Sequence, residues 1–401
     1  MDVKRILQAA AVAGIVLLLT GCWNSRELNE LAIVSGIGID LAPGGDEYKV
    51  TFQLVNPSST ATSTAASTGQ PSIVAVTATD RTLFGALRQA SKKATRQLFF
   101  AHTQLVVLGE SLSRSGINNV FDIFERSHEL RLNSAVLIAH NSDAASILKI
   151  LTPVESLPSM GMVKKTQNTS RVWGENRLVQ VFDIINGITG EGDLTINGVY
   201  IKGDPEEGMN KSNLDQSNTK TVINMNGLGV FRKGKLIYWI KDADARGTQW
   251  LLNKIEETVV NVDADDKKES VAVNIFYSKT SVKVELRDGL PVFHVNIREE
   301  GIVNETDSYI DLSKREEIIK LQKNLQQQTE SEVKQAFKTA QQSESDIFNF
   351  GNELKRNRPE EWALLDKEWG HLFAQGKLDL QVEAYIRSTG MSLKPYIPPD
   401  Q

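Results

Sequence analysis

The sequence predicts an α+β protein of more than one domain, with mixed or antiparallel sheets covered by helices in each domain. Three observations predict this class. The chain has 401 residues, of which 40% are hydrophobic and 24% charged, so it can bury more than one core. Strand-length runs that alternate apolar and polar residues recur along it, separated by amphipathic helical segments. A polar segment, residues 203–220, divides these elements into two groups.

The first 21 residues have the pattern of a lipoprotein signal peptide. Lys4 and Arg5 provide a basic start, and Ile6 to Leu19 form an apolar segment. That segment has about 14 residues, whereas a membrane-spanning helix needs about 20. The stretch "LTGC" then ends at Cys22 and resembles the lipobox of bacterial lipoproteins, in which the peptide is cut before a cysteine that carries S-diacylglyceryl and N-acyl groups.

Cys22 is the only cysteine in the chain, which excludes an intramolecular disulfide and any zinc site that needs a CxxC pair. A buried structural thiol and a catalytic thiol are the alternatives to a lipid site. The basic start, the apolar length and the small residues before the cysteine favour the lipid site, and two acyl chains hold a protein stably on a bilayer. We therefore expect a chain tethered on the outer side of a bacterial membrane, because no later segment is long and apolar enough to cross it.

The elements expected before residue 203 alternate strands with helices. Residues 31–40 and 48–54 should form a first hairpin about the turn "APGGDE", and residues 56–72 an exposed mobile loop of Ser, Thr and Ala. Further strands are expected at 73–79 and within "AHTQLVVLGE", "NSAVLIAH" and "LTINGVYIKG". Helices are expected from Leu83 to Ala94, through Phe121 and Phe124, after Asp143, and within 154–188.

The elements expected after residue 220 begin with a hairpin in "GLGVFRKGKLIYWI" and a helix through Trp250 and Ile255. The acidic stretch "NVDADDKKES" should be a loop before three strands at 271–277, 282–286 and 292–297. Ser313 and Glu316 should form a capping box for a long helix, before a last strand at 378–387. The expected units are residues 1–21 (signal peptide), 22–202 (N-terminal domain or domains), 203–220 (linker), 221–391 (C-terminal domain) and 392–401 (tail).

The residue patterns of common enzymes and metal sites are missing from the sequence. It contains no GxxxxGK[ST] or GxSxG motif, and "SGIGID" lacks the third glycine of a dinucleotide fingerprint. None of the five histidines has a second ligand two or four residues away, and Asp263, Asp265 and Asp266 lack the ligand series of a calcium loop. The net charge of -5 makes nucleic acid an unsuitable partner. We predict neither a catalytic site, nor a metal, nor a cofactor.

Two sets of charged residues are candidates for internal ion pairs that orient secondary structure. Arg126, Glu129 and Arg131 lie close to a predicted helix end in "ERSHELR". Arg246 precedes a glycine and the apolar part of a helix in "DADARGTQWLLN". A structural role is favoured over ligand contact for both sets.

Four stretches of the chain resemble Ger(x)C-type spore-germination lipoproteins. They are "GCWNSRELNELAIVSGIGID", then "FFAHTQLVVLGESLSRSGI" with "FERSHELR", then "GLGVFRKGKLIYWIKDADARG", and finally "DIFNFGNELKRNRPEEW". The resemblance implies several α/β-type domains without a known active site and the lipoprotein C-subunit of a germinant receptor. Its implied partners are a polytopic A-subunit, a permease-like B-subunit and the lipid bilayer of the spore inner membrane. It implies Cys22 as the lipid site and Trp23, Arg26, Glu27 and Leu28 as a membrane-proximal motif.

Two functional classes follow from the sequence. The favoured one is a non-enzymatic receptor subunit required for nutrient-triggered spore germination. The alternative is a solute-binding lipoprotein that delivers a ligand to a membrane transporter. That alternative should have two similar α/β lobes joined by a hinge that the chain crosses two or three times.

Overall fold

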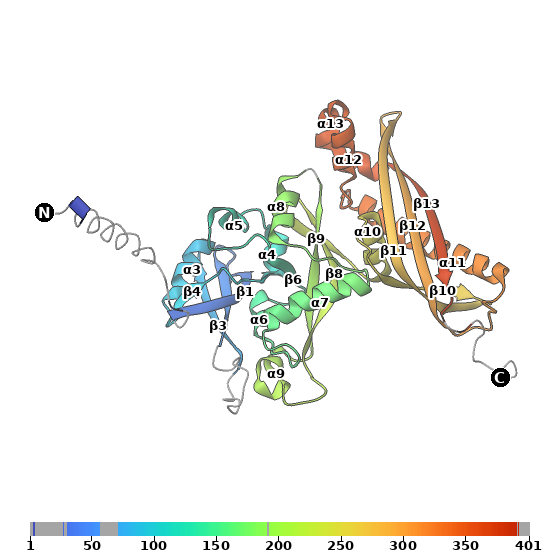
Figure 1. Ribbon diagram of the computed structural model, residues 1–401. Coiled ribbons are helices and arrows are strands. Elements are labelled where there is room, and N and C mark those ends of the chain that lie inside the picture. The colour runs from blue at the N-terminus through green and yellow to red at the C-terminus, as the bar shows by residue number, and fades with distance from the viewer. Residues whose placement is uncertain are drawn as a thin grey trace.

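The computed structural model describes residues 30–56, 71–190 and 192–390, together with residues 3, 4, 27 and 392. Most of the expected signal peptide, most of the Ser/Thr/Ala loop and most of the expected tail lie outside these residues. The predicted class is confirmed: two mixed sheets are covered by helices (Figure 1).

The larger sheet has nine strands in the order β3-β2-β1-β5-β6-β7-β8-β9, with β4 paired to β1. β1, β5, β6 and β7 are parallel neighbours, and antiparallel strands flank them on both sides. The strands are β1 (Leu31–Leu41), β2 (Tyr48–Val55), β3 (Ile73–Asp80), β4 (Gln97–Phe99), β5 (Leu105–Gly109), β6 (Ala135–Ala139), β7 (Leu194–Lys202), β8 (Val222–Arg232) and β9 (Lys235–Ile240). The predicted hairpins β1–β2 and β8–β9 are confirmed.

Helices cover both faces of this sheet, as its parallel centre requires. In β5, Val106 and Leu108 pack into one core, while Leu105 and Val107 pack into the other. One face is covered by α3 (Leu83–Ser91), α4 (Glu110–Ser115), α5 (Asp122–Arg126) and α8 (Val181–Thr189). The other is covered by α6 (Ala144–Lys149) and α7 (Pro158–Val172). Asp143 caps α6, because its side chain accepts a hydrogen bond from the amide of Ser146.

The segment 203–220, expected as a linker between domains, joins two neighbouring strands of the larger sheet. It contains α9 (Pro205–Met209) and a 3-10 turn (Lys211–Asn213). β7 and β8 on its two sides pair antiparallel from Leu194 opposite Phe231 to Lys202 opposite Val222. Hydrogen bonding therefore continues the first sheet through β9, and the chain changes sheet after Ile240.

The second sheet has four strands in the order β10-β11-β12-β13 and one helix-covered face. Its strands are β10 (Thr258–Ala264), β11 (Lys267–Arg287), β12 (Leu290–Thr306) and β13 (Lys377–Ser388). Its helices are α10 (Asp242–Leu251), α11 (Arg315–Gln342), α12 (Phe350–Asn357), α13 (Pro359–Leu365) and α14 (Trp369–Gln375), with a 3-10 turn at Asp366–Glu368. Leu228 and Val230 of β8 belong to the same core, so the two halves pack against each other.

Three sequence expectations for this half were wrong in detail. The acidic stretch is not a loop but the β10–β11 hairpin, in which Asp265 and Asp266 take positive φ values of 48° and 61°, as a two-residue hairpin turn requires. The two strands expected at 271–277 and 282–286 form one strand, β11, because β12 pairs along both. The capping box is absent, because the Ser313 hydroxyl donates to Asp311 and Lys314 occupies the N-cap.

Candidate functional site

The predicted lipid site and the motif after it lie almost wholly outside the described residues. This applies to Cys22, Trp23, Arg26 and Leu28. Glu27 is described, and its backbone carbonyl accepts a hydrogen bond from the amide of Glu30 at 3.0 Å. Leu31 then begins β1, an interior strand of the larger sheet. Within the described ranges, no helix combines the length and the hydropathy needed to cross a bilayer.

A polar hollow lies at the amino ends of the parallel strands β5 and β6. Leu105 pairs with Ala135 in these strands, so the residues just before each strand are brought together. The hollow has a volume of about 680 Å³ and is lined by Ala101, His102, Thr103, Gln104, Arg131, Leu132, Asn133, Ala135, Val163, Gln167, Leu178 and Gln180. Its amides and guanidinium suit a polar or anionic group. The Thr103 hydroxyl donates to the carbonyl of Val34, so it is not poised as a nucleophile.

A second hollow, which we call the α3–α5 groove, has a volume of about 600 Å³ and mixes apolar and charged groups. Its lining residues are Tyr48, Arg81, Thr82, Leu83, Phe84, Leu87, Arg88, Phe100, Asn119, Asp122, Ile123, Arg126, Ser127, His128, Glu129 and Leu130. The two stretches "FFAHTQL" and "FERSHELR" contribute to both hollows. Sequence segments on which the family resemblance rests therefore line both hollows of the larger sheet.

Arg126, Glu129 and Arg131 do not pair with one another. Arg126 instead forms an ion pair with Asp122, one helical turn earlier, at 2.8 Å. The hydrogen bond from Arg126 lowers the pKa of Asp122, but both side chains are mostly exposed, so the pair contributes little stability. The described residues give Glu129 and Arg131 no ion pair. Glu129 lines the α3–α5 groove and Arg131 the polar hollow.

Arg246 has the internal role that its sequence context suggested. It lies within α10, and its guanidinium contacts both carboxylate oxygens of Glu332 on α11, at 2.9 and 2.5 Å. It also donates to the carbonyl of Val259 in β10 at 3.1 Å. Arg246 thus ties two helices and a strand together, and its side chain is only 12% exposed.

A second carboxyl group lies beside this pair, and no pattern in the sequence pointed to it. Glu299 of β12 is fully buried, and one of its oxygens accepts a hydrogen bond from the Thr329 hydroxyl at 2.9 Å. Its other oxygen has no hydrogen-bond partner among the described residues. The pKa of Glu299 is raised to about 8, mainly by burial; the Thr329 hydrogen bond and Arg246 oppose this rise, while the nearby Glu332 carboxylate adds to it. Glu299 is therefore mostly protonated at neutral pH.

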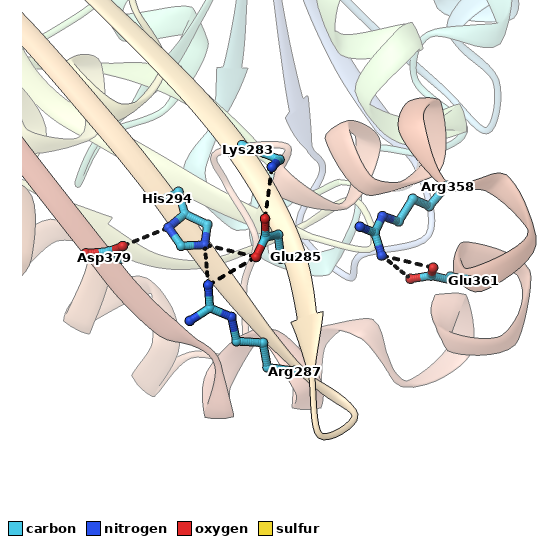
Figure 2. A network of polar contacts seen from close by, with 7 residues as sticks. All are labelled: Lys283, Glu285, Arg287, His294, Arg358, Glu361 and Asp379. Carbon is cyan, nitrogen blue, oxygen red and sulfur yellow. Dashed lines mark hydrogen bonds and ion pairs between the residues drawn. The ribbon is translucent and has the colours of Figure 1, made fainter.

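The open face of the second sheet carries a ladder of charged side chains (Figure 2). His294 of β12 lies between two carboxylates, with its Nδ1 at 2.7 Å from Asp379 and its Nε2 at 3.4 Å from Glu285. Glu285 also pairs with Lys283 and Arg287 on its own strand. Figure 2 shows a separate surface pair between Arg358 and Glu361. Both carboxylates that contact His294 belong to the second sheet, one on β11 and one on β13.

The candidate sites differ in their exposure and in the groups that line them. In the part of the chain that the structure describes, no group of three or more His, Cys, Asp or Glu side chains could hold a metal ion. The strongly perturbed Glu299 is sealed in a core rather than exposed to a cleft, which separates it from any substrate. The two hollows and the charged ladder are open surfaces that suit partners.

The fold of this chain is similar to that of a protein whose crystal structure has been determined. The crystal structure of the GerBC protein superposes with a TM-score of 0.56 at 19% identity, covering 88% of this chain and 97% of that one. Two family profiles match, "Spore germination protein N-terminal domain" over residues 24–201 and "Spore germination B3/ GerAC like, C-terminal" over residues 226–390. The chain therefore belongs to this family of spore germination proteins, and the sequence resemblance is confirmed.

Relatives from Bacillus subtilis (strain 168) match over nearly their whole length. Spore germination protein KC is 31% identical over 399 residues, covering 98% of each chain. Spore germination protein B3 is 24% identical over 382 residues, covering 94% of this chain and 96% of the relative. Spore germination protein A3 is 24% identical over 389 residues, covering 93% and 95%. These similarities support a role in spore germination for this chain.

Proposed function

We propose that the protein is a non-enzymatic lipoprotein C-subunit of a spore germinant receptor. It is anchored through Cys22 on the outer face of the spore inner membrane and is required for nutrient-triggered germination. Its partners are a polytopic A-subunit and a permease-like B-subunit. The observation that carries the proposal is a lipobox at the head of a chain whose length is matched almost throughout by spore germination proteins.

The architecture supports a subunit that presents surfaces to partners. The polar hollow, the α3–α5 groove and the charged ladder lie on two unlike sheets. A solute-binding lipoprotein should instead have two similar lobes around a central cleft. A nine-stranded mixed sheet joined to a four-stranded sheet does not have that symmetry, so the receptor subunit is the better account.

The test is to replace the lipid-accepting thiol. We expect Cys22→Ala to leave the precursor uncleaved and to prevent its lipid-dependent attachment to the membrane. We also expect spores with this variant to be slow or blocked in nutrient germination. Ser25→Ala, three residues further on, is the matched control and should be processed normally. Normal membrane retention together with normal germination in Cys22→Ala spores would contradict the proposal.

A further inference from the structure

One segment of the larger sheet concentrates positive charge. From Arg81 to Gly109 the sequence contains no Asp or Glu, although the chain as a whole has a net charge of -5. We call the five cations of this segment the basic surface, which comprises Arg81, Arg88, Lys92, Lys93 and Arg96. All five are exposed, and none takes part in an ion pair among the described residues. The side-chain amine of Lys93 donates a hydrogen bond to the carbonyl of Thr77.

Two of the carboxylates near the basic surface, Asp80 and Asp122, already have hydrogen-bond or ion-pair partners. Asp80 accepts hydrogen bonds from the amide and hydroxyl of Thr82 at the start of α3. Across the α3–α5 groove, Asp122 is paired with Arg126, which leaves Glu129 as the other carboxylate of the lining. Within the described residues, no ion pair neutralises the basic surface, and Glu30, which precedes Leu31, is the carboxylate nearest to Arg96 in the β1–β4 register.

The basic surface lies where the chain enters the fold. Gln97, the residue after Arg96, is opposite Leu31, the first residue of β1. Leu31 follows Cys22 by nine residues, and a chain of that length spans at most about 32 Å. Figure 1 shows α3 and β4 at the end of the molecule where the chain enters, with the second sheet at the opposite end. An anchor at Cys22 would therefore hold the basic surface close to a bilayer.

An exposed aromatic ring accompanies these cations. Phe84 on α3 is 52% exposed. The Arg88 guanidinium carbon lies 4.8 Å from the centre of its ring, one helical turn away. Basic side chains with an exposed Phe are typical of surfaces that rest in the headgroup region of a membrane.

We infer that the basic surface docks on anionic lipid headgroups of the same bilayer that holds the anchor. The inference rests on the proposed function, because Cys22 supplies the tether. Clustered Lys and Arg are attracted to an anionic leaflet over roughly one Debye length, about 8 Å at physiological salt. Docking makes the tethered chain lie in one orientation, with α3 against the lipid and the second sheet directed away from it.

The test is to label lysines on the full-length lipidated protein bound to vesicles. One vesicle population contains phosphatidylcholine alone, and the other contains equal amounts of phosphatidylcholine and phosphatidylglycerol. A water-soluble amine-acylating reagent is applied, and Lys92 and Lys93 are followed by peptide mass spectrometry. We expect both to react several-fold more slowly on the anionic vesicles, with the difference removed by high salt. Lys338 on α11 should react equally on both.

Charge-neutralised variants separate specific docking from general attraction. The triple variant Arg81→Gln/Arg88→Gln/Arg96→Gln keeps both reporter lysines and should lose their protection. The matched variant Lys268→Gln/Lys323→Gln/Lys367→Gln removes three exposed charges from the C-terminal half and should keep it. Both variants alter exposed residues, so circular dichroism should show unchanged folding.

The outcomes distinguish this inference from the proposed anchor. Binding to both vesicles with equal lysine reactivity overturns the docking surface and leaves the anchor standing. Protection on phosphatidylglycerol vesicles without binding to phosphatidylcholine supports the surface and contradicts the anchor. Protection in native spore membranes but not on anionic vesicles assigns the surface to a protein partner and overturns the lipid inference. Failure to bind either vesicle contradicts both.

Discussion

Arg246 of α10 and Glu332 of α11 face each other in a two-point ion pair, although 86 residues separate them in sequence. The side chains are 12% and 2% exposed, and Gly247 allows the helices to approach closely. A Cβ at residue 247 would lie 2.3 Å from the carbonyl oxygen of Glu332. The close contact between the two helices therefore depends on the ion pair and also on the absence of a side chain at Gly247.

Removing the guanidinium should destabilise the C-terminal half strongly. Arg246→Ala leaves the Glu332 carboxylate buried without its partner, which costs about 3 kcal/mol of unfolding free energy. The measurement is urea denaturation followed by tryptophan fluorescence. Arg126→Ala, which breaks the exposed pair with Asp122, is the control and should leave the unfolding free energy nearly unchanged. An equal loss in the two variants would contradict the structural role of Arg246.

The stability of the protein should carry a pH dependence that comes from Glu299. Burial raises its pKa to about 8 from an ordinary value of 4.5, so the folded state binds its proton more tightly than the unfolded state. That contribution to stability is complete below pH 4.5 and is lost as the pH rises to about 8. Between these values the contribution falls by up to about 1.4 kcal/mol per pH unit.

Glu299→Gln should remove this dependence, because an amide keeps an acceptor for the Thr329 hydroxyl but does not ionise. Measured at a series of pH values, the unfolding free energy of the parent should fall relative to that of the variant as the pH rises towards 8. Glu383→Gln, an exposed position on β13, is the control and should track the parent throughout. A parent-minus-variant difference that stays constant from pH 5 to pH 8 would contradict the raised pKa of Glu299.

Gly351 lies between two tryptophans, so we expect its substitution to disturb their packing. A Cβ at Gly351 of α12 would lie 2.7 Å from both Trp362 Cη2 and Trp369 Nε1, whose rings are 5.2 Å apart. Asp346 fixes the same cluster by accepting hydrogen bonds from the Gly351 amide at 2.7 Å and the Trp369 indole at 2.8 Å. Gly351→Ala should therefore overpack this core and cost about 1–3 kcal/mol.

The cost can be measured by thermal unfolding of Gly351→Ala beside Asn352→Ala, an exposed neighbour on the same helix. We expect a lower midpoint for the glycine variant and little change for the asparagine variant. Matching midpoints for the glycine variant and the parent would mean that the two tryptophans can move apart at no cost.

Local patterns in the sequence predicted most elements of the fold. The alternation in β2 predicts a strand because neighbouring side chains point to opposite faces, and Asp288-Gly289 predicts a turn because both take positive φ values. The capping box failed for a local reason, since Asp311 competes for the Ser313 hydroxyl. Residues 203–220 have linker composition, but composition does not report that the strands on either side pair.

The candidate sites depend more on contacts between residues that are far apart in the sequence. Arg246 could be singled out by its position before a glycine, but its partner lies on another helix, and Glu299 lies on a third element. His294 and Asp379 are 85 residues apart and meet because β13 aligns parallel to β12. The proposed lipid site at Cys22 is the opposite case, because the pattern that predicts it is contained in the first 22 residues.

The central claim is that Cys22 is the acylated first residue of the mature protein. The direct measurement is intact and amino-terminal peptide mass spectrometry of the protein extracted from spore inner membranes. We predict an amino-terminal peptide that begins at Cys22 and carries the mass of a diacylglyceryl group and an N-linked acyl chain. A peptide that begins at Cys22 without lipid, or a mature chain that retains residues before it, would contradict the account.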